Sequence, residues 1–181
     1  AGTPPSGVAL LETAAQEGTV DGLADLFAAW EIWSAEVLDS HVAYPILAYF
    51  RSSHDQTSWV SAVGAVLDAA TLVLTTVEGV PRGPARFMQR VGDHLVEDVA
   101  GSLGLRADGA VGVERAEFDE ARARLAAAGY RLAGADESWA DFRATRASYA
   151  SRINRLAAFW ATPPAQWIGD RSVLRGHERE A

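Results

Sequence analysis

Apolar residues recur at steps of three and four along most of this chain, which is the spacing of one face of an α-helix. The pattern predicts helices over about 19–40, 57–77, 85–103, 113–128 and 137–161. Pro45 disfavours helical geometry at the residue before it, so we expect a break near 42–45 and a short helix over about 45–54. Sustained alternation, which would predict strands, does not occur. The predicted fold is an all-α bundle of about six helices.

The stretch over 57–77 is apolar on most of its circumference, which is typical of a central helix. Asp68 is its only charged residue. A narrow seam of small and polar residues runs along it at steps of four and three: Thr57, Ser61, Gly64, Asp68, Thr71 and Thr75. An aspartate at the middle of a membrane costs about 2.5–3.5 kcal/mol, so we expect a buried central helix here rather than a membrane-spanning one.

Two other predicted helices have a well-defined apolar face. In the helix over 85–103 the face consists of Phe87, Met88, Val91, Leu95 and Val99. In the last helix, residues at strict three-four spacing are Trp139, Phe142, Arg146, Tyr149, Ile153, Leu156 and Trp160. Such a row is compatible with a coiled-coil seam, but its aromatic side chains favour docking on the body of the same domain.

Glycine, proline and charge mark the ends of the expected domain. Residues 1–18 contain two prolines and three glycines, and we expect them to form a flexible lead-in. Residues 19–168 should form a single helical domain, because a chain of this length can bury one core without disulfides or metals. The charged residues 169–181 follow a proline pair and are expected to form a disordered tail.

Composition excludes several classes of function. The chain contains no cysteine, which rules out disulfides, zinc–thiolate sites and thiol catalysis. Its formal net charge is −8 and it has no basic cluster, so we expect no nucleic-acid partner. It has neither a G-x-S-x-G motif nor a phosphate-binding glycine loop, and the residues indicate no catalytic group.

Five polar residues lie on or beside the apolar faces of four predicted helical segments: His41, His54, Asp68, His94 and Asp98. Imidazole and carboxylate groups on facing helices form the metal sites of helical bundles. The spacings match neither the Glu-x-x-His pairs of di-iron bundles nor H-E-x-x-H. One interpretation is therefore a transition-metal site in a stand-alone helical metalloprotein, with a metal-dependent oxidase or hydrolase as its activity.

The other interpretation is a satisfied polar network without a cofactor. In this case Asp68 pairs with an arginine such as Arg51 or Arg86, and Asp98 bonds to His94. The two remaining histidines lie near helix C-termini, where the helix dipole and free carbonyl groups favour them. Both interpretations are compatible with the pattern.

The residues W-E-I-W-S-A-E-V-L-D-S-H at 30–41, Y-P-I-L-A-Y-F-R-S-S-H at 44–54 and S-W at 58–59 carry a resemblance. The chain resembles, over residues 20–100, the cytoplasmic C-terminal region of bacterial two-transmembrane ion-channel family proteins, the potassium-channel-like proteins of actinobacteria. R-V-G-D-H-L-V-E-D at 90–98 continues the match more loosely.

The resemblance implies a soluble, non-catalytic sensor, regulatory or assembly domain on the cytoplasmic side of a membrane, tethered to a pore. Its expected partners are further copies of the chain or a channel pore subunit. The pore helices and a filter motif such as T-V-G-Y-G are missing from these residues, and we expect no membrane insertion by this chain itself.

Overall fold

The computed structural model describes residues 6–43, 59–106 and 112–168. These residues form seven α-helices, a 3₁₀ helix and one two-stranded antiparallel sheet, which confirms the predicted all-α class. The elements are α1 (Gly7–Gln16), η1 (Val20–Gly22), α2 (Leu23–Ala43), α3 (Trp59–Thr75), β1 (Val77–Glu78), α4 (Arg82–Ser102), α5 (Arg115–Ala127), β2 (Arg131–Leu132), α6 (Ala135–Arg146) and α7 (Ala150–Phe159).

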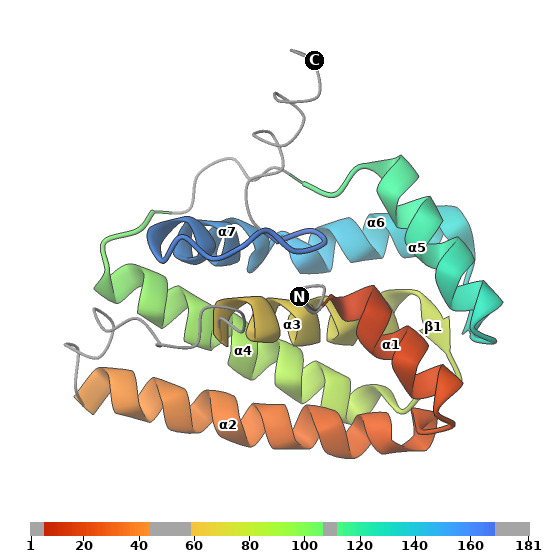
Figure 1. Ribbon diagram of the computed structural model, residues 1–181, viewed down its shortest axis with the longest axis horizontal. Helices are drawn as coiled ribbons and strands as arrows, with labels where there is room; N and C mark the ends of the chain where they lie inside the picture. The colour runs from red at the N-terminus through yellow and green to blue at the C-terminus, as the bar shows by residue number, and fades with distance from the viewer. Residues whose placement is uncertain (1–5, 44–58, 107–111, 169–181) are drawn as a thin grey trace, which may run out of the picture.

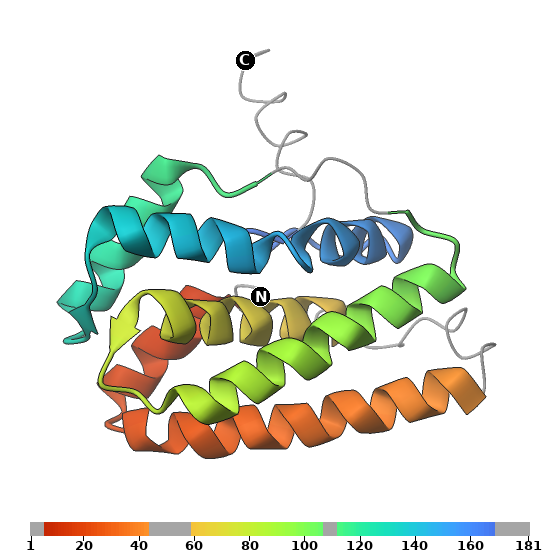
Figure 2. The ribbon, with the colours of Figure 1, turned by 180° about the vertical axis from the view of Figure 1, so that it is seen from behind.

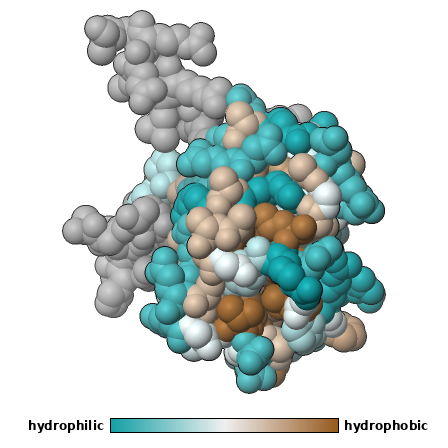
Figure 3. Space-filling model, turned by 90° about the vertical axis from the view of Figure 1, so that its right-hand side faces the viewer, coloured by the Kyte–Doolittle hydropathy of each residue, from teal (hydrophilic) through white to brown (hydrophobic). Residues whose placement is uncertain are grey.

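The helices lie in layers in Figure 1, with α2 lowest, α3 and α4 in the middle, and α6 and α7 above them. The view from behind shows α4 crossing between α2 and the upper helices (Figure 2). α3 contacts α1, α2, α4, α6 and α7, and 14 of its 17 residues are buried. α5 lies at the right-hand end, where hydrophilic residues surround two small hydrophobic areas (Figure 3).

Helix α1 corrects the expected flexible lead-in, because most of residues 6–18 are helical and packed. Ser6 caps the helix by accepting a hydrogen bond from the backbone N–H of Ala9, and Val8 and Leu11 are fully buried. Gly7 lets α1 approach α3 closely: a Cβ atom there would lie 2.6 Å from the backbone nitrogen of Ala69. Tertiary packing therefore stabilises a helix that is too short to be predicted from its own pattern.

The last predicted helix is also corrected, since residues 137–161 form two helices rather than one. The chain turns at 147–149, where the N–H groups of Ser148 and Tyr149 bond to carbonyl groups three residues earlier. The predicted row nevertheless faces the core on both sides of the turn. Its members Phe142, Arg146, Tyr149, Ile153 and Leu156 are all buried in this domain.

The other described helices begin and end within a few residues of the predictions. α4 begins three residues early, because proline is tolerated in the first turn and Pro84 lies there. Within the three described ranges, no helix is both long and apolar enough to cross a membrane. The predicted helix over 45–54 and the expected tail over 169–181 lie outside the described residues.

Candidate functional site

A buried charged network lies where the polar seam of α3 meets α6 and the turn after it. Asp68 is fully buried, and only 4% of Arg146 is exposed. Arg146 Nε donates to Asp68 Oδ1 at 2.8 Å, and the Tyr149 hydroxyl donates to the same oxygen at 2.7 Å. Tyr149 Oη also lies 2.9 Å from Thr71 Oγ1, which must be the donor because Tyr149 has used its only proton. The polar seam of α3 is therefore the face on which the end of α6 and the following turn pack.

Arg146 connects this network to the segment that follows α7. Its Nη2 donates to the carbonyl oxygen of Trp167 at 2.6 Å. Trp167 has a φ of 64°, and this left-handed geometry costs a residue with a side chain about 1–2 kcal/mol. The backbone bridge between Ala165 and Ile168 holds the same turn. One guanidinium group thus stabilises a strained turn and a buried carboxylate at once.

Burial and charge together set the protonation of the network. Burial raises the pKa of Tyr149 well above its ordinary value, and the negative charge of Asp68 raises it further. For Arg146 burial is the largest single influence and acts to lower the pKa, but the charge of Asp68, the interaction with Tyr149 and the hydrogen bond to Asp68 together raise it. At neutral pH Arg146 is therefore a cation and Tyr149 is a neutral hydrogen-bond donor.

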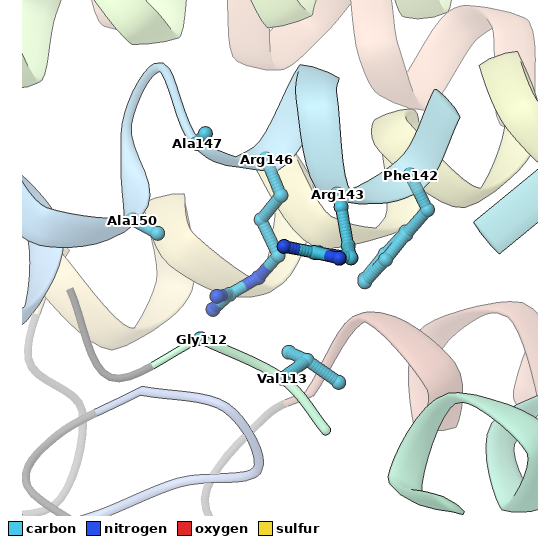
Figure 4. Close-up of a pocket in the computed structure, with 7 residues that line it drawn as sticks. All are labelled: Gly112, Val113, Phe142, Arg143, Arg146, Ala147 and Ala150. Atoms are coloured by element: carbon cyan, nitrogen blue, oxygen red, sulfur yellow. The ribbon is translucent and has the colours of Figure 1, made fainter. Parts of the chain in front are cut away.

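Arg146 also lines a pocket of about 200 Å³. The side chains of Phe142, Arg143 and Arg146 extend from α6 toward the Gly112–Val113 segment (Figure 4). Ala147 and Ala150, from the turn and the start of α7, complete the lining. The pocket therefore combines two guanidinium groups with apolar walls, and we call it the Arg146 pocket.

A second concave surface lies between α2 and α4, and we call it the α2–α4 groove. Its volume is about 580 Å³. It is lined by Ala35, Leu38, Asp39, Phe87, Arg90, Val91 and His94. Phe87 was predicted to be buried, but 57% of it is exposed. The outer edge of the apolar face of α4 extends beyond its contact with α2, which leaves this ring uncovered.

The structure does not bring the described candidate metal ligands together. His94 and Asp98 lie 3.5 Å apart on α4, with 62% and 41% of their side chains exposed, whereas Asp68 is fully buried. Among the described residues, no three histidine or acidic side chains could share a metal ion. The side chain of His41 and the whole of His54 lie outside the described residues. His94 and Asp98 are therefore neighbours on α4, as expected, but no hydrogen bond joins them.

The partner predicted for Asp68 also needs correction. Arg146 forms the ion pair, while Arg86 is exposed on α4 and Arg51 lies outside the described residues. The sequence did contain a signal for this pair. Asp68 is the only charge on the predicted helix over 57–77, and Arg146 is the only polar member of the last apolar row.

The described polar groups of this region fall into two sets with different chemistry. Asp68, Thr71 and Tyr149 are hydrogen-bonded in the interior, which is typical of a structural network. Arg143 and Arg146 line a pocket, where guanidinium groups are suited to binding an anion. No protein-family model, curated protein or solved structure matches this chain.

Proposed function

We propose that this chain is a regulatory or assembly domain that binds a second copy of itself through the α2–α4 groove. The observation that carries the proposal is the exposed apolar surface of the two helices. Among the described residues, Ile32 and Phe87 are the two most exposed large hydrophobic side chains, at 61% and 57%. Ile32 lies on α2 about one helical turn before Ala35, which lines the groove.

The charges in the groove favour a second copy of this chain over other occupants. Asp39 and Arg90 both line the groove, and neither forms an ion pair within the described part of the chain. In a two-fold dimer, any contact between residue i and residue j occurs twice. A dimer across the groove can therefore pair Asp39 of each copy with Arg90 of the other while it covers Phe87.

The resemblance to the cytoplasmic region of bacterial ion channels supports a specific context for this assembly. A channel pore built from several subunits would bring copies of the domain together on the cytoplasmic side of the membrane. Reading the gene on both sides of this sequence tests the context directly. A pore-encoding segment supports it, and a complete gene without one contradicts it.

Self-association is tested by sedimentation equilibrium of wild type, Asp39→Arg and Arg90→Asp. Each charge reversal replaces two attractive contacts by two repulsive ones, so we expect dimerisation to weaken about tenfold or more in each variant. An equimolar mixture of the two variants should dimerise again, because the mixed dimer pairs opposite charges at both positions. An ion pair within one chain cannot be restored by mixing.

Phe87→Ser and Phe159→Ser form a matched pair for the apolar part of the proposal. Both side chains are exposed, but Phe159 lies on α7 and not in the groove. We expect only Phe87→Ser to weaken the dimer. A wild-type protein that stays monomeric at the highest soluble concentration, or equal effects of the two serine variants, would contradict the proposal.

A further inference from the structure

We propose that the Arg146 pocket binds a small monocarboxylate, with its carboxylate on Arg143 and Arg146 and its short aliphatic chain against the apolar wall. The site is distinct from the α2–α4 groove, and the proposal does not depend on self-association.

The hydrogen-bonding state of Arg146 points to a missing acceptor. A guanidinium group has five N–H donors. Nε donates to Asp68 and Nη2 donates to the carbonyl of Trp167, whereas Nη1 makes no hydrogen bond to any described residue. Only 4% of Arg146 is exposed, so the donors of Nη1 have little access to water. Its side chain lines the pocket, so an acceptor placed there would complete the set.

The charges around the pocket favour a ligand with one negative charge. Asp68 already balances Arg146. Arg143 packs its guanidinium carbon 5.4 Å from the centroid of the Trp139 ring and forms no ion pair with a described residue. None of the described lining residues is acidic, which leaves a surplus of one positive charge among them. A carboxylate neutralises this surplus, while a doubly charged phosphate would leave an uncompensated charge in a partly buried space.

The size and walls of the pocket limit the rest of the ligand. A volume of about 200 Å³ corresponds to roughly seven water molecules at about 30 Å³ each, which is below the usual range for drug-sized ligands. Val113, Phe142, Ala147 and Ala150 supply an apolar lining beside the two arginines. A carboxylate with a chain of a few carbon atoms matches both the volume and the lining.

Binding at this position would act on the turn that follows α7. The same guanidinium group that would hold the ligand also holds the carbonyl of Trp167, whose backbone is strained. Ile168, next in the chain, packs so closely on α3 that a Cβ atom at Gly64 would lie 2.6 Å from its Cδ1. A bound carboxylate should therefore slow amide exchange at 167–168 as well as raise the thermal stability of the whole domain.

Butanoate is the probe, and butanamide and inorganic phosphate are the comparisons, in thermal unfolding and calorimetric titration at constant ionic strength. At a hundredfold excess over its Kd, butanoate should raise the Tm of a domain of this size by about 5–10 °C. Butanamide, which has the same shape but no charge, should have no effect. Equal stabilisation by butanamide or by phosphate would contradict the assignment of a monocarboxylate.

Arg143→Met is the decisive variant, because Arg143 is exposed and its loss should leave the fold intact. Arg86→Met removes an equally exposed arginine from α4, outside the pocket, and serves as the matched control. We expect Arg143→Met to weaken butanoate binding about tenfold or more, and Arg86→Met to leave it unchanged. An undiminished response of Arg143→Met, or no response of the wild type, would overturn the proposal.

Discussion

The buried ion pair between Asp68 and Arg146 makes a quantitative prediction about stability. Replacing Asp68 by asparagine keeps the shape of the side chain but removes its charge. Arg146 would then remain as a cation with 4% exposure and no counter-charge. Breaking a buried pair from one side costs about 3–5 kcal/mol, so we expect that loss in the free energy of unfolding of Asp68→Asn. In a domain of this size the Tm should fall by about 6–20 °C.

Arg146→Met should be comparably destabilising, because it strands the carboxylate of Asp68 and also releases the Trp167 carbonyl. The double variant contains no buried charge. We therefore expect it to be more stable than the sum of the two single effects predicts, by about 3 kcal/mol. Urea denaturation followed by circular dichroism at the helix band measures all four proteins. The double-mutant cycle is valid only if the free energy of unfolding depends on urea concentration with the same slope in all four proteins.

The exposed pair of Arg115 and Asp119 is the control for this cycle. Arg115 Nε lies 2.9 Å from Asp119 Oδ2, so the contact has a geometry like that of the buried pair, but 41% and 48% of the side chains are exposed. The coupling between its two substitutions should be too small to resolve. If the buried cycle is additive within about 0.5 kcal/mol, burial does not enforce the pair and our reasoning is refuted.

Two further predictions concern pH and close packing. The pKa of Tyr149 is raised in the folded state, so its stabilising effect is complete below about pH 10 and is lost as the pH rises further, when only the unfolded chain loses the proton. Unfolding measured between neutral pH and the alkaline limit should show this decline, and Tyr149→Phe should reduce it; an unchanged decline would contradict the assignment. Gly7→Ala places a Cβ 2.6 Å from backbone and should cost about 1–3 kcal/mol, while Gly101→Ala, in α4 with nothing within 4 Å, should stabilise by about 0.4–1 kcal/mol. Thermal unfolding of both alanine variants checks the difference, and equal effects would refute the packing argument.

The faces of the helices could be predicted from the sequence, but their partners could not. Three-four spacing identified the seam on α3 and the row along α6 and α7, and the described seam residues and the five middle members of the row are buried. Periodicity says which side of a helix is turned inward and nothing about which helix it meets. The pairing of Asp68 with Arg146 depends on contacts 78 residues apart in the chain. The only local indication of this pairing was that each of the two buried faces contains a single charged residue.

Short elements were missed for a different reason. α1 has ten residues, and such a length is marginal for an isolated helix in water. It is stable here because Val8 and Leu11 are buried and Gly7 permits contact with α3. The turn at 147–149 was missed because the buried row continues through it in register. Tertiary contacts decided both features, and neither leaves a strong local pattern.

The exposed edge of α4 is the error that is most informative about function. Its helical pattern places Phe87 and Val91 on one apolar face, yet within the described residues α2 covers only part of that face. An apolar face that is wider than its contact within the chain exposes hydrophobic area to water. Covering this area with a partner would gain about 25 cal/mol of free energy per Å² of apolar surface. The apolar face predicted for α4 therefore includes Phe87, which a dimer across the α2–α4 groove would bury but a single chain leaves exposed. On this reasoning the disagreement between sequence and structure at Phe87 is the same observation that supports self-association.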